Sequence, residues 1–186
     1  SLIKQTNLIV KMFEDVLGFD FKCDTIILGS EIMAFEKVFP ELNINFSRSE
    51  TSQKQLSAFI KEYFEILINT KNKSEHHVVE GGGLSDECLL ALNQNENVKV
   101  VCVGKTLISP EEFFDEIRKY EKNLETYGWT KRLDDDTLLR WCAGWIKQSK
   151  KNKEFCKKNN ITFIDTSHNQ MEVLGEFVEN VKQNIK

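Results

Sequence analysis

Short, mostly apolar runs alternate with helical segments along nearly the whole chain, and this order limits the possible folds more than any other feature. Four runs have the length and composition of β-strands: residues 24–28, 76–79, 98–103 and 161–165. Apolar residues follow one another in them rather than alternating with polar ones, which is typical of a parallel sheet covered on both faces. The sequence therefore predicts a three-layer α/β domain, with a parallel sheet between two layers of helices.

The segments between these runs carry the signals of helices. Helices are expected over residues 2–17, 30–39 and 51–69, after Ser85, after Ser109, from residues 134–136 and over residues 171–185. The clearest start is at Ser109, because Pro110 fits the first position of a helix and Glu112 completes a capping box with the serine. Strand and helix signals therefore agree on an alternating order.

The composition is that of a folded globular chain. Forty per cent of the 186 residues are hydrophobic and 29% are charged, so one domain is expected over residues 1–186. The formal net charge is −4, whereas proteins that bind nucleic acids are usually basic. The lysines between residues 147 and 158 are therefore interpreted as a solvated helix face, and no nucleic-acid partner is expected.

Apolar run lengths and cysteine spacing indicate the environment of the protein. The longest apolar runs span a few residues, far short of the about 20 that a membrane helix needs, so no membrane partner is expected. The five cysteines lie far apart and none forms a Cys-x-x-Cys motif. This pattern indicates free thiols in a reducing cytoplasm rather than a disulfide framework or a zinc site.

The segments that follow the four predicted strands are the candidate site, because parallel α/β sheets bind ligands beyond the carboxyl ends of their strands. These segments are residues 29–31, 80–83, 104–106 and 165–168. In the second, Glu80 precedes three consecutive glycines and Ser85 follows them. Glu80 could position a magnesium-bound water or accept a proton, with the glycines allowing close approach of substrate. The alternative is a flexible turn that Ser85 ends as a helix cap.

The sequence Gly104-Lys105-Thr106 supplies the last three positions of a phosphate-binding P-loop. Lys99, however, stands where that motif requires its first glycine, and residues 99–103 belong to a predicted strand rather than a loop. We therefore expect a turn at the end of the strand, with Lys105 solvated or in contact with substrate.

Four stretches carry a resemblance to a known family. They are IILGSEIMAFEKVFPELNI, HHVVEGGGLS, RKYEKNLETYGWTKRLDDDTLLRWCAGWIKQSKKNKEFCKK and ITFIDTSHNQMEVL. In this order they resemble the P-loop nucleotide and metabolite kinases, the adenylate-kinase-like proteins, and most closely their bacterial kinase-like ATP-binding members. The resemblance covers the chain from about residue 20. It implies a P-loop NTPase fold with a lid-like helical region at about residues 118–158.

The resemblance also implies an activity: an ATP-binding, kinase-like phosphotransferase that acts on a small metabolite or a nucleotide. Glu80 would hold Mg²⁺ through water or act as a base, and Arg118 and Arg132 would stabilise the transferring phosphoryl group. The other implied contacts are Thr166, Ser167 and His168 with the ATP cofactor, and Ser30, Glu31 and Gly81 with the substrate.

The chain departs from the family in two places. Many relatives have an aspartate where this chain has Ser30 and Glu31, and the Walker A strand and loop are absent from the sequence. Strands without that central neighbour would bury unpaired backbone groups, at about 1–3 kcal/mol each. We therefore expect the P-loop to come from chain upstream, or another segment or subunit to complete the sheet. The alternative is a non-catalytic relative that binds a nucleotide or a partner protein.

Overall fold

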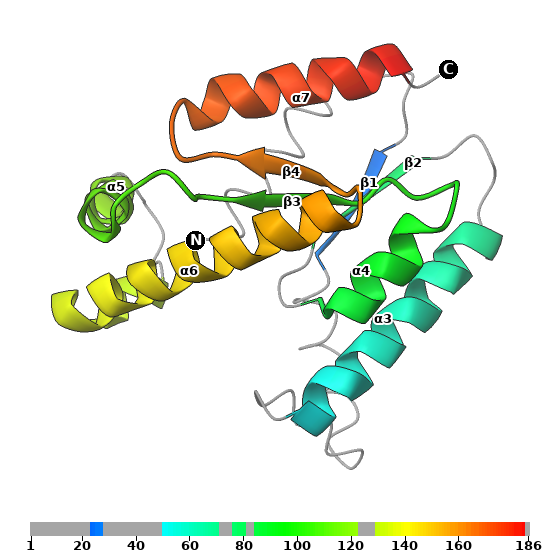
Figure 1. Ribbon diagram of the computed structural model, residues 1–186, viewed down its shortest axis with the longest axis horizontal. Helices are drawn as coiled ribbons and strands as arrows, with labels where there is room; N and C mark the ends of the chain where they lie inside the picture. Colours follow the sequence, from blue (N-terminus) through cyan, green and yellow to red (C-terminus); the bar gives the residue numbers. More distant parts are fainter. Residues whose placement is uncertain (1–22, 28–49, 71–75, 81–83, 123–128, 185–186) are drawn as a thin grey trace. The chain divides into compact units, whose positions relative to one another are not determined.

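The computed structural model describes residues 23–27, 50–70, 76–80, 84–122 and 129–184 (Figure 1). The elements are β1 (Cys23–Ile27), α3 (Glu50–Thr70), β2 (His76–Glu80), α4 (Asp86–Asn93), β3 (Val101–Gly104), α5 (Pro110–Lys122), the 3-10 helix η2 (Trp129–Arg132), α6 (Asp135–Lys158), β4 (Thr162–Asp165) and α7 (Gln170–Asn184). They belong to two compact units, one within residues 6–100 and the other containing residues 101–186. The predicted helices over residues 2–17 and 30–39 lie outside the described residues.

The first unit contains a parallel strand pair and a packed pair of helices. Cys23 of β1 lies opposite His76 of β2, and Ile27 lies opposite Glu80, so both strands end at the same edge. Helices α3 and α4 pack against each other. Their core contains Ile60, Cys88 and Leu92, with seven partly buried neighbours: Phe59, Tyr63, Phe64, Val79, Leu84, Val98 and Val100.

Helix α4 begins where the sequence predicts, directly after its cap residue Ser85. The Ser85 hydroxyl accepts a hydrogen bond from the backbone N–H of Cys88 at 3.2 Å, which satisfies a donor in the first turn. The predicted strand over residues 98–103 begins later, at Val101. Val98 and Val100 pack on the core of the first unit instead of extending the ladder of β3.

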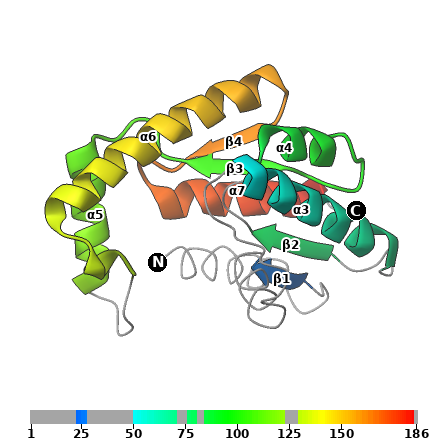
Figure 2. The same ribbon diagram turned by 90° about the horizontal axis from the view of Figure 1, so that it is seen from below.

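The second unit is an α/β layer structure. Strands β3 and β4 pair in parallel, with Val101 opposite Thr162 and Gly104 opposite Asp165. Helix α6 packs on both strands and α7 on β4, and the two helices cover opposite faces of the pair (Figures 1 and 2). Parallel pairing and helices on two faces are therefore confirmed for this unit. Among the described residues, each of the two sheets has two strands.

Helices α5 and α6 of the second unit have defined starts. Ser109 and Glu112 form the predicted capping box at α5: the N–H of Ser109 donates to Glu112 Oε2 at 2.9 Å, and the N–H of Glu112 donates to Ser109 Oγ at 3.1 Å. Asp134 caps α6 by accepting from the N–H of Thr137 at 2.8 Å. In the described part of the chain, no helix combines the length and apolar character that crossing a bilayer requires.

Candidate functional site

The carboxyl ends of β3 and β4 bring two loops together, residues 105–109 and residues 166–169. They meet because the strands are adjacent and parallel, with Gly104 opposite Asp165. The N–H of Thr166 donates to Gly104 O at 2.8 Å, which extends the strand pairing into the second loop. This edge is the part of an α/β layer structure where ligands bind.

Asp165 is the centre of the hydrogen bonding between the two loops. Its Oδ1 accepts from Ser167 Oγ at 2.6 Å and from the backbone N–H groups of Ser167 and Thr106 at 3.2 Å each. Its Oδ2 accepts from Thr106 Oγ1 and from Lys153 Nζ, the latter at 3.0 Å. Burial works against ionisation of this carboxyl, but hydrogen bonds from Ser167, Thr106 and Lys153 outweigh it and hold the pKa of Asp165 well below its ordinary value.

Lys105 follows Gly104 at the same edge, and it is buried. The expectation that Lys105 is solvated or in contact with substrate is therefore corrected. Its side chain is 9% exposed and forms an ion pair with Glu116 at 2.9 Å. The ammonium group also donates to the carbonyl of Thr166 at 2.7 Å and lies 5.5 Å from the centre of the Phe113 ring. Lys105 therefore joins α5 to the loop after β4, which is a different task from reaching a phosphate.

Gly104 is required by packing rather than by a phosphate. A Cβ atom at this position would lie 2.8 Å from Ser149 Oγ on α6 and 2.9 Å from the ring of Phe163 on β4. The close approach lets the N–H of Lys105 donate to Ser149 Oγ at 3.3 Å. The absence of a side chain at Gly104 thus allows helix α6 to pack closely against the end of β3.

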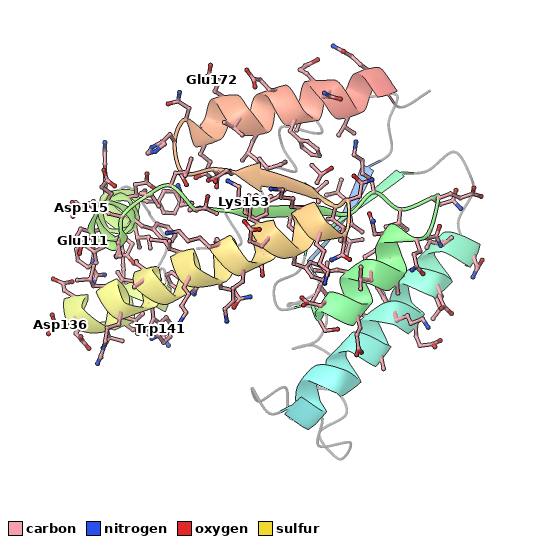
Figure 3. All side chains as sticks on the ribbon, viewed as in Figure 1. Glu111, Asp115, Asp136, Trp141, Lys153 and Glu172 are labelled. Atoms are coloured by element: carbon pink, nitrogen blue, oxygen red, sulfur yellow. The ribbon has the colours of Figure 1, made fainter. Side chains whose placement is uncertain are left out.

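Lys153 and Ser149 are functional candidates that sequence reasoning missed. Lys153 extends from α6 toward the strands (Figure 3), where its Nζ reaches Asp165 and also donates to Thr106 Oγ1 at 3.2 Å. The two residues stand four positions apart on α6 and therefore share one face of the helix. The four-residue spacing can be seen in the sequence. It does not indicate a site by itself, because the partners Lys105, Thr106 and Asp165 lie far away along the chain.

Arg118, a predicted catalytic residue, is bound by the protein itself. Its Nε donates to Asp135 Oδ1 at 3.1 Å, and its two amino groups donate to Glu121, Asp135 and the carbonyls of Thr130 and Leu133 at 2.6 to 3.4 Å. These five hydrogen bonds match the five N–H groups of a guanidinium. The pKa of Arg118 is raised, first by its hydrogen bond to Glu121. In this arrangement Arg118 joins the end of α5 to η2 and to the start of α6.

The other predicted site residues have varied positions. Thr166 and Ser167 are 3% and 2% exposed, so their side chains face the protein, whereas His168 is exposed. Arg132 is exposed at the end of η2. Glu80 is the last residue of β2, one position beyond the predicted strand, and lies at the carboxyl edge of the β1–β2 pair. Ser30, Glu31 and Gly81 lie outside the described residues.

Metal ligands of the clustered kind are absent from the described part of the chain, where no group of three or more histidine, cysteine or acidic side chains could hold an ion. A magnesium ion carried by a nucleotide needs fewer protein ligands, since one carboxylate, water and phosphate oxygens complete its coordination shell.

Neither a scan against protein-family models nor searches of curated proteins and of solved structures found a match to this chain. Function is therefore inferred from the residues and their geometry.

Proposed function

We propose that the chain is an ATP-binding, kinase-like phosphotransferase of the P-loop NTPase fold that acts on a small metabolite or a nucleotide. The observation that supports this most is the edge at which β3 and β4 end. Two loops, residues 105–109 and 166–169, are joined there by buried and partly buried hydrogen bonds, where a parallel α/β layer structure binds its ligand. The exposure of His168 and Leu107 on these two loops supports the proposal, because both side chains are open to a ligand there.

The proposed chemistry gives tasks to residues that the resemblance implies. The γ-phosphoryl group passes from ATP to a hydroxyl of the acceptor, giving ADP and a phosphate ester, and Glu80 takes the proton of that hydroxyl directly or through water. Mg²⁺, when bound through water to Glu80 and to the phosphates, would neutralise their charge. Arg132 is the proposed phosphoryl contact, and the loop with Thr166, Ser167 and His168 receives the nucleotide. Ser30, Glu31 and Gly81 are the proposed substrate contacts.

The test begins with binding and continues with turnover. Titration calorimetry with ATP and Mg²⁺ should give a dissociation constant, and ADP formation should appear with at least one acceptor from a panel of hydroxyl metabolites and nucleotides. Glu80→Gln should reduce ADP formation by about 100-fold or more, since general acid–base groups contribute about 10² to 10⁴. Its melting temperature should stay unchanged.

Glu62→Gln is the matched control, because it removes an exposed carboxylate from α3 of the same unit. It should leave both ATP binding and ADP formation unchanged. Absence of ATP binding by the unmodified protein would overturn the proposal. Full turnover by Glu80→Gln would remove the role given to Glu80.

A second candidate is a non-catalytic relative that binds a nucleotide or a partner protein. Arg118 favours it, because all of the guanidinium donors that a phosphoryl group would need are used within the protein. If the chain is a nucleotide-binding relative of this kind, it should bind ATP without forming ADP with any acceptor.

The structural role of Arg118 predicts a loss of stability in Arg118→Met. The free energy of unfolding should fall by about 3 kcal/mol, because Glu121, with a side chain 6% exposed, would lose its ion pair. Arg140→Met removes an exposed arginine from α6 and should change stability by less than about 0.5 kcal/mol. Urea unfolding measures both. A catalytic Arg118 would instead give Arg118→Met unchanged stability and reduced turnover.

A further inference from the structure

The hydroxyl of Ser167 is fully used within the protein. It accepts hydrogen bonds from the N–H groups of Thr106 and Leu107, both at 2.8 Å, and donates to Asp165 Oδ1 at 2.6 Å. A serine hydroxyl offers one donor and two acceptor positions, so all three are filled. With 2% of the residue exposed, Ser167 has almost no surface that a ligand at the edge could contact.

We call Thr106, Lys153, Asp165 and Ser167 the edge latch, since their side chains tie three separate elements together. Thr106 belongs to the loop after β3, Lys153 to α6, and Asp165 and Ser167 to the end of β4 and its loop. Lys153 Nζ lies 3.0 Å from Asp165 Oδ2 and donates to Thr106 Oγ1 at 3.2 Å. The Lys153 side chain is 43% exposed, whereas Thr106 and Ser167 are buried, and satisfied hydrogen bonds among buried polar groups rigidify the segments they join.

The latch fixes the backbone of a residue whose own side chain is in solvent. Leu107 is 67% exposed, although its N–H is bound to buried Ser167. The exposed side chain of Leu107 gives this edge an apolar surface. A planar ring, such as the base of a nucleotide, could pack against that surface. His168 follows Ser167 on the opposite loop and is also exposed.

We propose that Asp165 and Ser167 are positioning residues of the nucleotide site, which hold Leu107 where the base of the nucleotide lies against it. This inference rests on the proposed function. It gives Ser167 a different task from the direct contact that the sequence predicts. Ser167 sets the loop, Asp165 holds Ser167 and Thr106, and Leu107 makes the contact.

The test compares ATP affinity with stability in three variants of the full chain. Ser167→Cys keeps the size of the side chain and weakens its hydrogen bonds. Thr130→Val is its matched control, because Thr130 is 7% exposed and its hydroxyl donates to Glu121 in the same unit, and Thr130 belongs to η2 rather than to either loop of the edge. Leu107→Ser changes an exposed side chain and should fold normally. Melting temperature and the ATP dissociation constant are measured for each, below the melting transition.

If Ser167 positions the loop, the ATP dissociation constant should be about tenfold higher in Ser167→Cys. A change of this size corresponds to the net contribution of about one hydrogen bond. Leu107→Ser should raise it similarly without lowering the melting temperature, while Thr130→Val should lower the melting temperature and leave the dissociation constant within about twofold. A purely structural latch would lower melting temperatures only.

Two results overturn the positioning role while leaving ATP binding in place. One is an unchanged dissociation constant in Leu107→Ser, which decides the matter even where Ser167→Cys fails to fold. The other is an equal rise in Ser167→Cys and Thr130→Val. If the unmodified protein does not bind ATP, the proposed function itself fails and the positioning role falls with it.

Discussion

Asp165 keeps its charge while its side chain is only 18% exposed, because every hydrogen bond it accepts favours the ionised form. The pKa in the folded protein lies below its ordinary value of 3.8, so the unfolded chain takes up this proton first as the pH falls. The stabilisation is therefore complete above that ordinary value and is lost progressively as the pH falls below it.

This sign gives a prediction for acid unfolding. In Asp165→Asn, the free energy of unfolding should be lower at neutral pH and should decline less steeply between about pH 4 and pH 2. The decline will persist in part, since hydrogen bonds with Ser109 and with Thr137 also lower the pKa values of Glu112 and Asp134. Urea unfolding at a series of pH values, followed by tryptophan fluorescence, measures the slope.

Glu154→Gln is the control for the change of charge, because Glu154 is an exposed residue of α6 in the same unit. It should reproduce the acid profile of the unmodified protein. An Asp165→Asn profile parallel to that of the unmodified protein would show that the latch does not depend on an ionised carboxylate.

At the scale of elements, two glycines of the second unit should respond in opposite ways to the same change. Gly104→Ala places a Cβ within 2.9 Å of Phe163 and closer still to Ser149, so it should cost about 1–3 kcal/mol. Gly144 lies in α6, and a Cβ added there would have no neighbour within 4 Å, so Gly144→Ala should stabilise by about 0.5–1 kcal/mol.

Urea unfolding of both alanine variants tests how tightly α6 approaches β3. If Gly104→Ala is as stable as the unmodified protein, α6 does not approach β3 as closely as the geometry states. If Gly144→Ala is destabilised, the outer face of α6 is covered.

The elements were more predictable than the site. Ser85 and Ser109 cap their helices as the sequence indicates, because a cap is a local interaction within a few residues. Asp134 caps α6 at the first residue of the segment where a helix start was predicted. Lys105 was misplaced because its partners, Glu116 and the carbonyl of Thr166, come from elements that only the folded chain brings to it. A lysine after a glycine is expected to face solvent until those partners are known.

At the scale of the whole molecule, the sequence predicts parallel pairing correctly, because continuous apolar runs separated by helices leave few alternatives. The sequence does not predict which strands pair with each other. Residues 98–100 show why: their valines have strand character, yet Val98 and Val100 pack on the core around Ile60. Pairing depends on contacts between distant segments, and local pattern carries little information about those.

Three buried thiols give each unit its own probe of local opening. Cys88 lies in the core of the first unit, and Cys142 and Cys156 are fully buried in the second. Burial raises the pKa of Cys88 and that of Cys142, the latter to about 11, so little reactive thiolate forms in the closed protein. When reclosing is faster than alkylation, a reagent would thus modify each thiol at a rate proportional to the fraction of molecules in which its surroundings are open. Peptide mass spectrometry of the alkylated protein would then give the free energy of local opening for each unit separately, without an added label or a substitution.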